Sequence, residues 1–216
     1  MFSCGAVESF VTKDIHHEWP RYWLPVTETL TLEADGFLPD PEDLFGRHYN
    51  PMLRQLDSLR DLPILVLLGE PGCGKSTALE DEYRQLLAAG ERVHRVRLEE
   101  CTASDVVSTV FEAQEVEDWR RGDGRLFLLL DSLDECRLTL PMPNVVGILM
   151  RELGRLPTER LCLRLSCRTS EWPWGAEDEL DRILARGAES PEPVPWETAK
   201  PGAHSRPSRQ IGRAHV

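Results

Sequence analysis

The chain has 216 residues, with 25 lysines and arginines against 37 aspartates and glutamates, and a formal net charge of −12 at pH 7. This length accommodates one sizeable domain with a modest extension, and 41% apolar with 29% charged residues is a globular rather than a disordered composition. The acidic balance argues against direct binding to nucleic acid or to an anionic membrane surface.

The sequence carries no sign of a membrane segment or of secretion. Its longest apolar runs, ILVLL and LFLLL, fall far short of the roughly 20 residues that a membrane-spanning helix needs. The N-terminus lacks the basic and apolar regions of a secretory signal. The six cysteines form no CxxC pair and are expected to be reduced thiols. These features predict a cytoplasmic protein without a membrane partner.

Three regions differ in composition. Residues 1–60 contain the proline-rich stretches WPRYWLP and FLPDP, and proline disfavours helix at the preceding residue. We therefore expect a mostly irregular, extended leader that packs on the core, with one short helix over 52–59. Residues 61–185 form the predicted domain, in which apolar strands alternate with amphipathic helices.

Within 61–185 the hydrophobic pattern predicts an α/β fold. Strands are expected over 62–68, 92–98, 125–131 and 160–168. Helices are expected over 75–89, 104–116 and 144–155. This alternation is typical of a parallel sheet covered by helices on both faces, a three-layer sandwich. The strand over 92–98 is the least apolar of the four, so we expect it near an edge of the sheet.

The tail, residues 186–216, is expected to be disordered and is left out of the fold prediction. No acidic residue follows Glu197, and the tail is rich in proline, serine, glycine and histidine. Its last seven residues, QIGRAHV, match the in-frame translation of a common sequencing adapter. We interpret them as read-through from a truncated gene fragment.

The most specific motif is GEPGCGKST, which fits the phosphate-binding pattern G-x-x-x-x-G-K-[ST]. Glycines let backbone N–H groups turn around a phosphate, and the following helix adds the positive end of its dipole. Lys75 would bind the β- and γ-phosphates, and the Ser76 hydroxyl would bind Mg²⁺. The predicted cofactor-binding residues are Gly69, Glu70, Pro71, Gly72, Cys73, Gly74, Lys75, Ser76 and Thr77.

The second motif is LFLLLDSLDE, an apolar strand that ends in carboxylates. Hydrolysis of a nucleoside triphosphate needs one carboxylate for Mg²⁺ and another for the attacking water. Asp131 closes the strand and, with Ser76, is the predicted metal site. Glu135 is the predicted catalytic carboxylate that handles water, and Asp134 is expected to support it.

The third feature is the strand end LRLSCRTSEW. Arg168 would lie at the carboxyl edge of the sheet, where ligands bind in open α/β folds, and could stabilise charge on a transferring phosphate. Just beyond it, Trp172 and Trp174 flank Pro173, and we expect them to form a packed hydrophobic corner.

Together these motifs resemble those of the STAND class of P-loop NTPases, and NACHT-type domains of bacterial proteins in particular. The most discriminating part is the D-[GAS]-x-D-E form of the acidic motif, Asp131 to Glu135. The resemblance covers roughly residues 60–180. It implies a mainly parallel five-stranded sheet of the ASCE-type strand order, in which the strand before Arg168 lies between the loop strand and the Asp131 strand. It also implies ATP with Mg²⁺, a nucleotide-controlled switch within a larger signalling or defence protein, and self-association of that protein.

Two alternative functions stay open. A remodelling ATPase of the AAA+ type usually has a polar uncharged residue where this chain has Arg168. A nucleotide-binding scaffold without turnover would bind nucleotide at the loop and not hydrolyse it. A GTPase is disfavoured because no N-K-x-D motif follows the loop, and a small-molecule kinase would need a substrate lid that we do not find.

Overall fold

The computed structural model describes residues 20–102, 105–136, 142–187 and 210–215. The strands are β1 Tyr22–Pro25, β2 Ile64–Leu68, β3 Arg92–Arg97, β4 Leu126–Asp131, β5 Leu161–Cys167 and β6 Gln210–His215. The α-helices are α1 Leu44–Tyr49, α2 Lys75–Ala88, α3 Val106–Phe111, α4 Gln114–Arg121, α5 Met142–Leu153 and α6 Ala176–Gly187. Short 3₁₀ turns are η1 Leu56–Leu59, η2 Leu98–Glu100, η3 Leu133–Glu135, η4 Thr158–Arg160 and η5 Thr169–Glu171.

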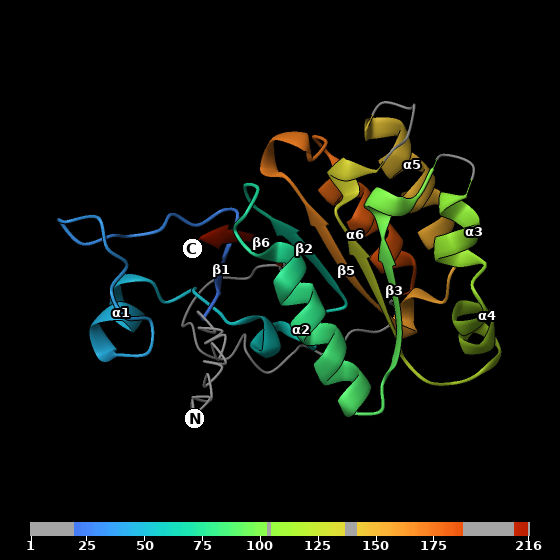
Figure 1. Ribbon diagram of the computed structural model, residues 1–216, viewed down its shortest axis with the longest axis horizontal. Coiled ribbons are helices and arrows are strands. Elements are labelled where there is room, and N and C mark those ends of the chain that lie inside the picture. Colours follow the sequence, from blue (N-terminus) through green and yellow to red (C-terminus); the bar gives the residue numbers. More distant parts are fainter. Residues whose placement is uncertain (1–19, 103–104, 137–141, 188–209, 216) are drawn as a thin grey trace, which may run out of the picture.

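Four neighbouring parallel strands form the centre of an α/β fold. They lie in the order β2-β5-β4-β3, and Figure 1 shows them with helices packed around them. The expected position of β5 between β2 and β4 is confirmed. The least apolar strand, β3, lies at the end of the order, as predicted. Because all four strands run the same way, their carboxyl ends meet at one edge of the sheet.

The expectation of a five-stranded sheet is wrong for the described residues, where the sheet has six strands in the order β1-β6-β2-β5-β4-β3. β6 pairs parallel to β2, and β1 pairs antiparallel to β6. The expectation that the whole tail is disordered also differs from the structure at residues 210–215, which form β6. An unpaired strand edge offers backbone N–H and C=O groups that any extended segment can bond, whatever its side chains.

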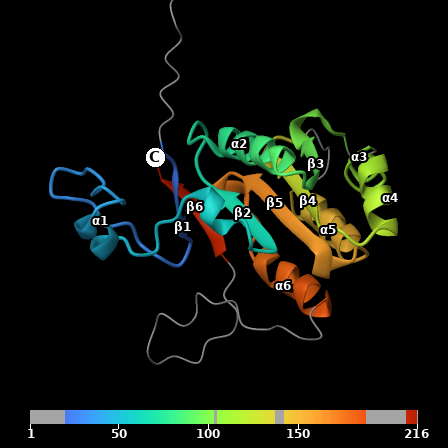
Figure 2. The ribbon, with the colours of Figure 1, turned by 90° about the horizontal axis from the view of Figure 1, so that it is seen from below.

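Helices cover both faces of the sheet, because alternate strand residues point to opposite sides. On one face α2 covers the apolar side chains of Leu65, Leu67, Phe127 and Leu129. On the other face a larger core packs β-strand residues against α3, α4, α5 and α6. Figure 2 shows α2 on one side of the sheet and α5 and α6 on the other. β4 and β5 are buried along their whole length.

Two predicted helices differ in extent from the observed ones. The helix expected over 104–116 is broken into α3 and α4, because Ala113 adopts an extended conformation (φ −62°, ψ 149°) as the residue before α4. This break lets Phe111 and Trp119 both reach the same core. The short helix expected over 52–59 is reduced to the 3₁₀ turn η1.

Trp23 of the leader is buried and belongs to the same apolar cluster as Leu59, Leu67 and Leu79. The backbone of Trp23 also exchanges two hydrogen bonds with Arg54, with N···O distances of 2.7 and 2.9 Å. The segment between β1 and α1 instead carries exposed apolar side chains, among them Phe37. The described part of the leader is therefore held at β1.

An ion pair is buried beneath α2. Arg164 of β5 is fully buried, and its Nε donates to Oε1 of Glu82 at 3.0 Å. The same guanidinium donates to the backbone carbonyls of Arg60 at 2.7 Å and Leu62 at 2.9 Å. Two ions removed from water are tolerated when they are paired and hydrogen-bonded in this way. Arg164 thus links α2 and the segment before β2 to the centre of the sheet.

Replacing Glu82 by alanine should lower the free energy of unfolding by about 3 kcal/mol, because it leaves the Arg164 charge buried without its counter-ion. Urea denaturation followed by circular dichroism measures this change. Arg121→Ala is the matched control, since Arg121 is exposed and its ion pairs with Glu117 and Asp118 span 3.8 and 3.9 Å. It should cost less than about 1 kcal/mol. Equal effects of the two variants would contradict this account.

Candidate functional site

The residues of the phosphate-binding pattern, 69–76, span the turn between β2 and α2 and the first two residues of α2, at the carboxyl edge of the sheet. Gly72 and Gly74 have φ values of 81° and 84°. Residues that have a Cβ atom rarely adopt this left-handed region of backbone conformation. Gly74 is the residue immediately before α2. A Cβ placed there would clash with Nε of Arg21 and force that side chain to move. The two glycines therefore let the backbone turn tightly into the helix.

The predicted cofactor-binding residues lie together in this loop and in the first turn of α2. Lys75 directs its ammonium back over the loop, and Nζ donates to the carbonyls of Gly69 at 2.7 Å and Glu70 at 3.1 Å. Nζ also lies 3.8 Å from the sulfur of Cys73. The residues of the loop and first turn that are exposed to solvent are Glu70, Pro71, Gly72, Ser76 and Thr77. A positive charge and the N-terminus of α2 are thus presented at one accessible place.

The predicted metal residues, Ser76 and Asp131, are in direct contact. Oγ of Ser76 donates to Oδ1 of Asp131 at 3.0 Å, although the two residues are 55 positions apart. The same carboxylate oxygen accepts a hydrogen bond from Oγ of Ser166 at 2.6 Å. Oδ2 faces Nη2 of Arg95 at 3.9 Å. Hydroxyl and carboxylate oxygens are the ligands that Mg²⁺ prefers, so this pair of side chains fits such an ion.

The predicted catalytic residues form a second cluster. Nε of Arg168 lies 2.7 Å from Oδ2 of Asp134, and its Nη2 lies 2.9 Å from Oε1 of Glu135. The backbone N–H of Arg168 also donates to Oδ1 of Asp134 at 2.9 Å. The side chain of Asp134 is buried, whereas 43% of the Glu135 side chain is exposed. Among the described residues no hydrogen bond or ion pair joins this cluster to Lys75.

Ser132 lies between Asp131, the predicted metal-side carboxylate, and the second acidic cluster. Its φ of 58° makes it the sole residue other than glycine with a positive φ among those described, a conformation that costs roughly 1 kcal/mol or more. Two hydrogen bonds hold it there: its N–H donates to Oγ of Ser166 at 2.8 Å, and its carbonyl accepts from Glu135 N at 3.0 Å. The chain therefore turns sharply after β4 and brings Asp134 and Glu135 toward Arg168.

The surroundings of the two clusters shift the pKa of nearby groups. The pKa of Arg168 is raised above its ordinary value. The largest cause is its hydrogen bond to Glu135, and the next largest is the negative charge of Asp134. Burial raises the pKa of the Cys167 thiol to about 12, and the negative charge of Asp134 adds to this shift. The positive charge of Lys75 acts on Cys167 in the opposite sense. Burial also raises the pKa of Cys136 to about 11.

Three further residues near these clusters were not predicted from the sequence: Ser166, Arg95 and Arg21. Ser166 and Arg95 lie on the α2 face of the sheet, as Asp131 does, and strand alternation could have found them once the strand order was known. Arg21 lies against Gly74, and its Nη1 lies 3.7 Å from Oδ2 of Asp81 on α2. No feature of the leader sequence indicates that Arg21 reaches the loop.

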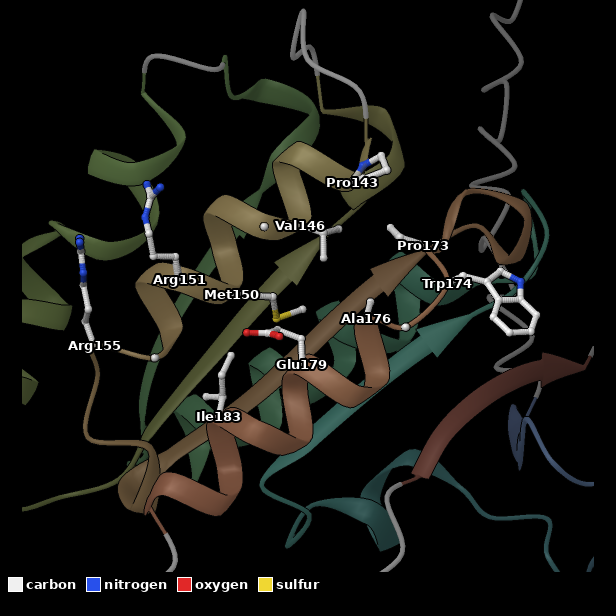
Figure 3. Close-up of a pocket in the computed structure, with 13 residues that line it drawn as sticks. Pro143, Val146, Met150, Arg151, Arg155, Pro173, Trp174, Ala176, Glu179 and Ile183 are labelled. Carbon is white, nitrogen blue, oxygen red and sulfur yellow. The ribbon is translucent and has the colours of Figure 1, made fainter.

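A surface pocket of about 510 Å³ lies away from the loop, between α5 and α6. Figure 3 shows Met150 of α5 and Ile183 of α6 facing the space between these helices, with Trp174 at one end. Trp174 is fully exposed, whereas Trp172 is buried and donates from Nε1 to Glu177. The expected hydrophobic corner is therefore confirmed for Trp172 and wrong for Trp174. The pocket holds none of the predicted site residues, so the site is defined by the loop rather than by this cavity.

Comparison with known proteins adds no family assignment: no family model matches the chain, and no curated protein matches it. The described ranges contain no group of three or more histidine, cysteine or acidic side chains arranged to hold a metal ion by themselves. Within the same ranges, no helix combines the length and hydropathy that crossing a bilayer requires.

Alkylation of the native protein by iodoacetamide at pH 8 should leave Cys136 and Cys167 unmodified, because their raised pKa values keep them as thiols and the thiolate is the reactive form. Cys73, in the accessible loop, should be modified first. Peptide mapping by mass spectrometry reads each site separately, and the denatured chain is the control in which all three react. Modification of Cys167 before Cys73 would contradict the described burial.

Proposed function

We propose that this chain is an ATP-binding, Mg²⁺-dependent NTPase switch domain of the NACHT/STAND-like kind, within a larger cytoplasmic signalling or defence protein. The observation that carries the proposal is the hydrogen bond between Ser76 and Asp131. It joins the last residue of the phosphate-binding pattern to the first carboxylate of the acidic motif. Two motifs recognised separately in the sequence therefore meet at one point of the fold.

The loop supplies the binding half of this function. Glycines at positive φ and the start of α2 present backbone N–H groups to an anion. The ammonium of Lys75 donates hydrogen bonds to two loop carbonyls. We propose that, when nucleotide binds, it donates to phosphate oxygens instead of these neutral acceptors. A hydrogen bond between two charged groups is roughly twice as strong as one to a neutral acceptor.

Ser76 and Asp131 would hold Mg²⁺ together with phosphate oxygens. When bound, this ion neutralises charge on the β- and γ-phosphates and orients them for transfer. The absence of a larger group of metal ligands among the described residues is in keeping with such a site, since Mg²⁺ is usually bound by one or two protein side chains plus substrate phosphates.

Glu135 is the carboxylate best placed to handle water. It is half exposed, whereas Asp134 is buried and accepts hydrogen bonds from the backbone and side chain of Arg168. We assign Glu135 the role of orienting or deprotonating the attacking water, and Asp134 the role of holding Arg168 at the strand end. Arg168 would then lie near the transferring phosphate.

The strand order supports the NACHT/STAND-like reading and, with it, the ASCE-type P-loop sandwich. β5 lies between β2 and β4, and a charged Arg168 stands at the end of β5, where an AAA+ remodelling ATPase usually has an uncharged residue. Self-association of the larger protein is part of the proposal. A scaffold without turnover remains the second candidate, because Arg168 engages both carboxylates that hydrolysis would need.

Lys75→Ala should weaken ATP binding at least tenfold, because one charge-assisted contact to phosphate contributes about 1.5–3 kcal/mol. Isothermal titration calorimetry with Mg²⁺ and ATP measures the affinity. Arg84→Ala is the matched control: it removes a cation from the same helix, at an exposed position paired with Glu80, and should leave the affinity unchanged. Equal ATP affinity of Lys75→Ala and the wild type would contradict the proposal.

Glu135→Gln separates a slow ATPase from a scaffold. If Glu135 handles the water, this variant should retain ATP binding and lose at least tenfold in phosphate release, since a positioned general base contributes roughly 10²–10⁴-fold. Release of radioactive phosphate from labelled ATP under single-turnover conditions measures the effect. If the wild type and Glu135→Gln release phosphate at the same rate, the scaffold without turnover is favoured.

A further inference from the structure

Resting on the proposed function, we infer that Ser166 is a positioning residue that aims the Asp131 carboxylate at Mg²⁺ and fixes the turn toward Asp134 and Glu135. The residue belongs to neither of the two nucleotide-binding motifs. Its hydroxyl nevertheless contacts both the side chain of Asp131 and the backbone that follows it.

The hydroxyl of Ser166 both donates and accepts a hydrogen bond in these contacts. A serine hydroxyl has one proton to donate and two lone pairs that accept. Here the proton goes to Oδ1 of Asp131 at 2.6 Å, and a lone pair accepts from the Ser132 N–H at 2.8 Å. Ser166 and Asp131 are both about 1% exposed. Water therefore has little access to replace the hydroxyl if it is removed.

The two oxygens of Asp131 have different partners. Oδ1 accepts from Ser166 and from Ser76, whereas Oδ2 faces Nη2 of Arg95 at 3.9 Å, beyond hydrogen-bond distance. Arg95 already pairs with Glu80 of α2, and its Nε is buried without a hydrogen-bond partner among the described residues. Without Ser166 the carboxylate could rotate toward this guanidinium and form a closer ion pair.

Such a rotation would compete with the metal. A carboxylate paired with arginine is already neutralised, and Mg²⁺ demands near-ideal octahedral geometry from its ligands. By holding Oδ1 beside Ser76, Ser166 keeps the metal-side oxygen in place before nucleotide arrives. Removing the hydroxyl should therefore weaken the metal-dependent part of binding and spare the contacts that the loop itself makes.

The same hydroxyl acts on the second acidic cluster through the backbone. Ser132 keeps its positive φ because its N–H is bonded to Ser166. Directly after β5, the N–H of Arg168 donates to Asp134 of η3. The end of β5 and the residue that follows it thus hold the chain after β4 at two points, Ser132 and Asp134.

The experiment compares Ser166→Ala with Ser166→Thr, which keeps a hydroxyl, in the full chain. Calorimetry measures ATP affinity twice, once in Mg²⁺ and once in EDTA. We expect Ser166→Ala to lose about tenfold in Mg²⁺ and to be unchanged in EDTA, and Ser166→Thr to recover at least part of the loss. Ser58→Ala is the matched control, because its exposed hydroxyl bonds only the nearby carbonyl of Gln55.

The outcomes separate this inference from the proposed function. Unchanged affinity of Ser166→Ala in Mg²⁺, or equal losses with and without the metal, would overturn the positioning role. Failure of the wild type to bind ATP would overturn the proposed function and the inference with it. Thermal unfolding shows whether Ser166→Ala folds. If it does not, Ser166→Cys replaces it, since a thiol is similar in size to the hydroxyl but a weak hydrogen-bond donor. Ser166→Cys must then lose ATP affinity in Mg²⁺ and keep it in EDTA.

Discussion

One oxygen atom connects the parts of the candidate site. Oδ1 of Asp131 accepts hydrogen bonds from Ser76 at the start of α2 and from Ser166 near the end of β5. Three chain segments therefore meet at a buried carboxylate, which needs such partners because an unpaired buried charge is costly. The arrangement depends on parallel strands that end at the same edge of the sheet, since only then do the two strand ends and the loop helix lie together.

β5 organises this edge through its alternate residues. Arg164, Ser166 and Arg168 are two positions apart, the spacing that places strand residues on one face. Arg164 bonds Glu82 of α2, Ser166 bonds the end of β4, and Arg168 bonds both carboxylates of η3. A single strand and the residue after it thus contact the loop helix, Asp131 and the two carboxylates of η3. The opposite face of the same strand is wholly apolar and belongs to the main core.

Much of the fold could be predicted from the sequence, because apolar runs and glycine turns are local signals. The four parallel strands and α2 were predicted in this way, and so was the glycine-rich turn between β2 and α2. Ser166 and Arg95 were not found, because their partner is an acid on a neighbouring strand and strand order is not a local property. β6 was missed for a related reason: pairing along an open edge uses backbone groups, which leave no mark on the side-chain pattern.

The contacts of Asp134 and Glu135 with Arg168 could not be predicted from the sequence either. The motif places Asp134 and Glu135 three and four residues after the strand, but their different exposure follows from the positive φ of Ser132. This turn buries Asp134 and leaves Glu135 facing solvent. The sequence already favoured Glu135 over Asp134 as the carboxylate that handles water, and the different exposure of the two side chains supports that proposal.

The central claim is that nucleotide binds at the loop Gly69–Ser76. Titration of the ¹⁵N-labelled chain with Mg²⁺ and ATP, followed by the shifts of backbone amide resonances in NMR spectra, tests it most directly. The account predicts that the largest shifts fall on residues 72–77 and on Ser132, at the end of β4. Absence of shifts at saturating ATP, or shifts confined to the pocket between α5 and α6 that Figure 3 shows, would contradict it.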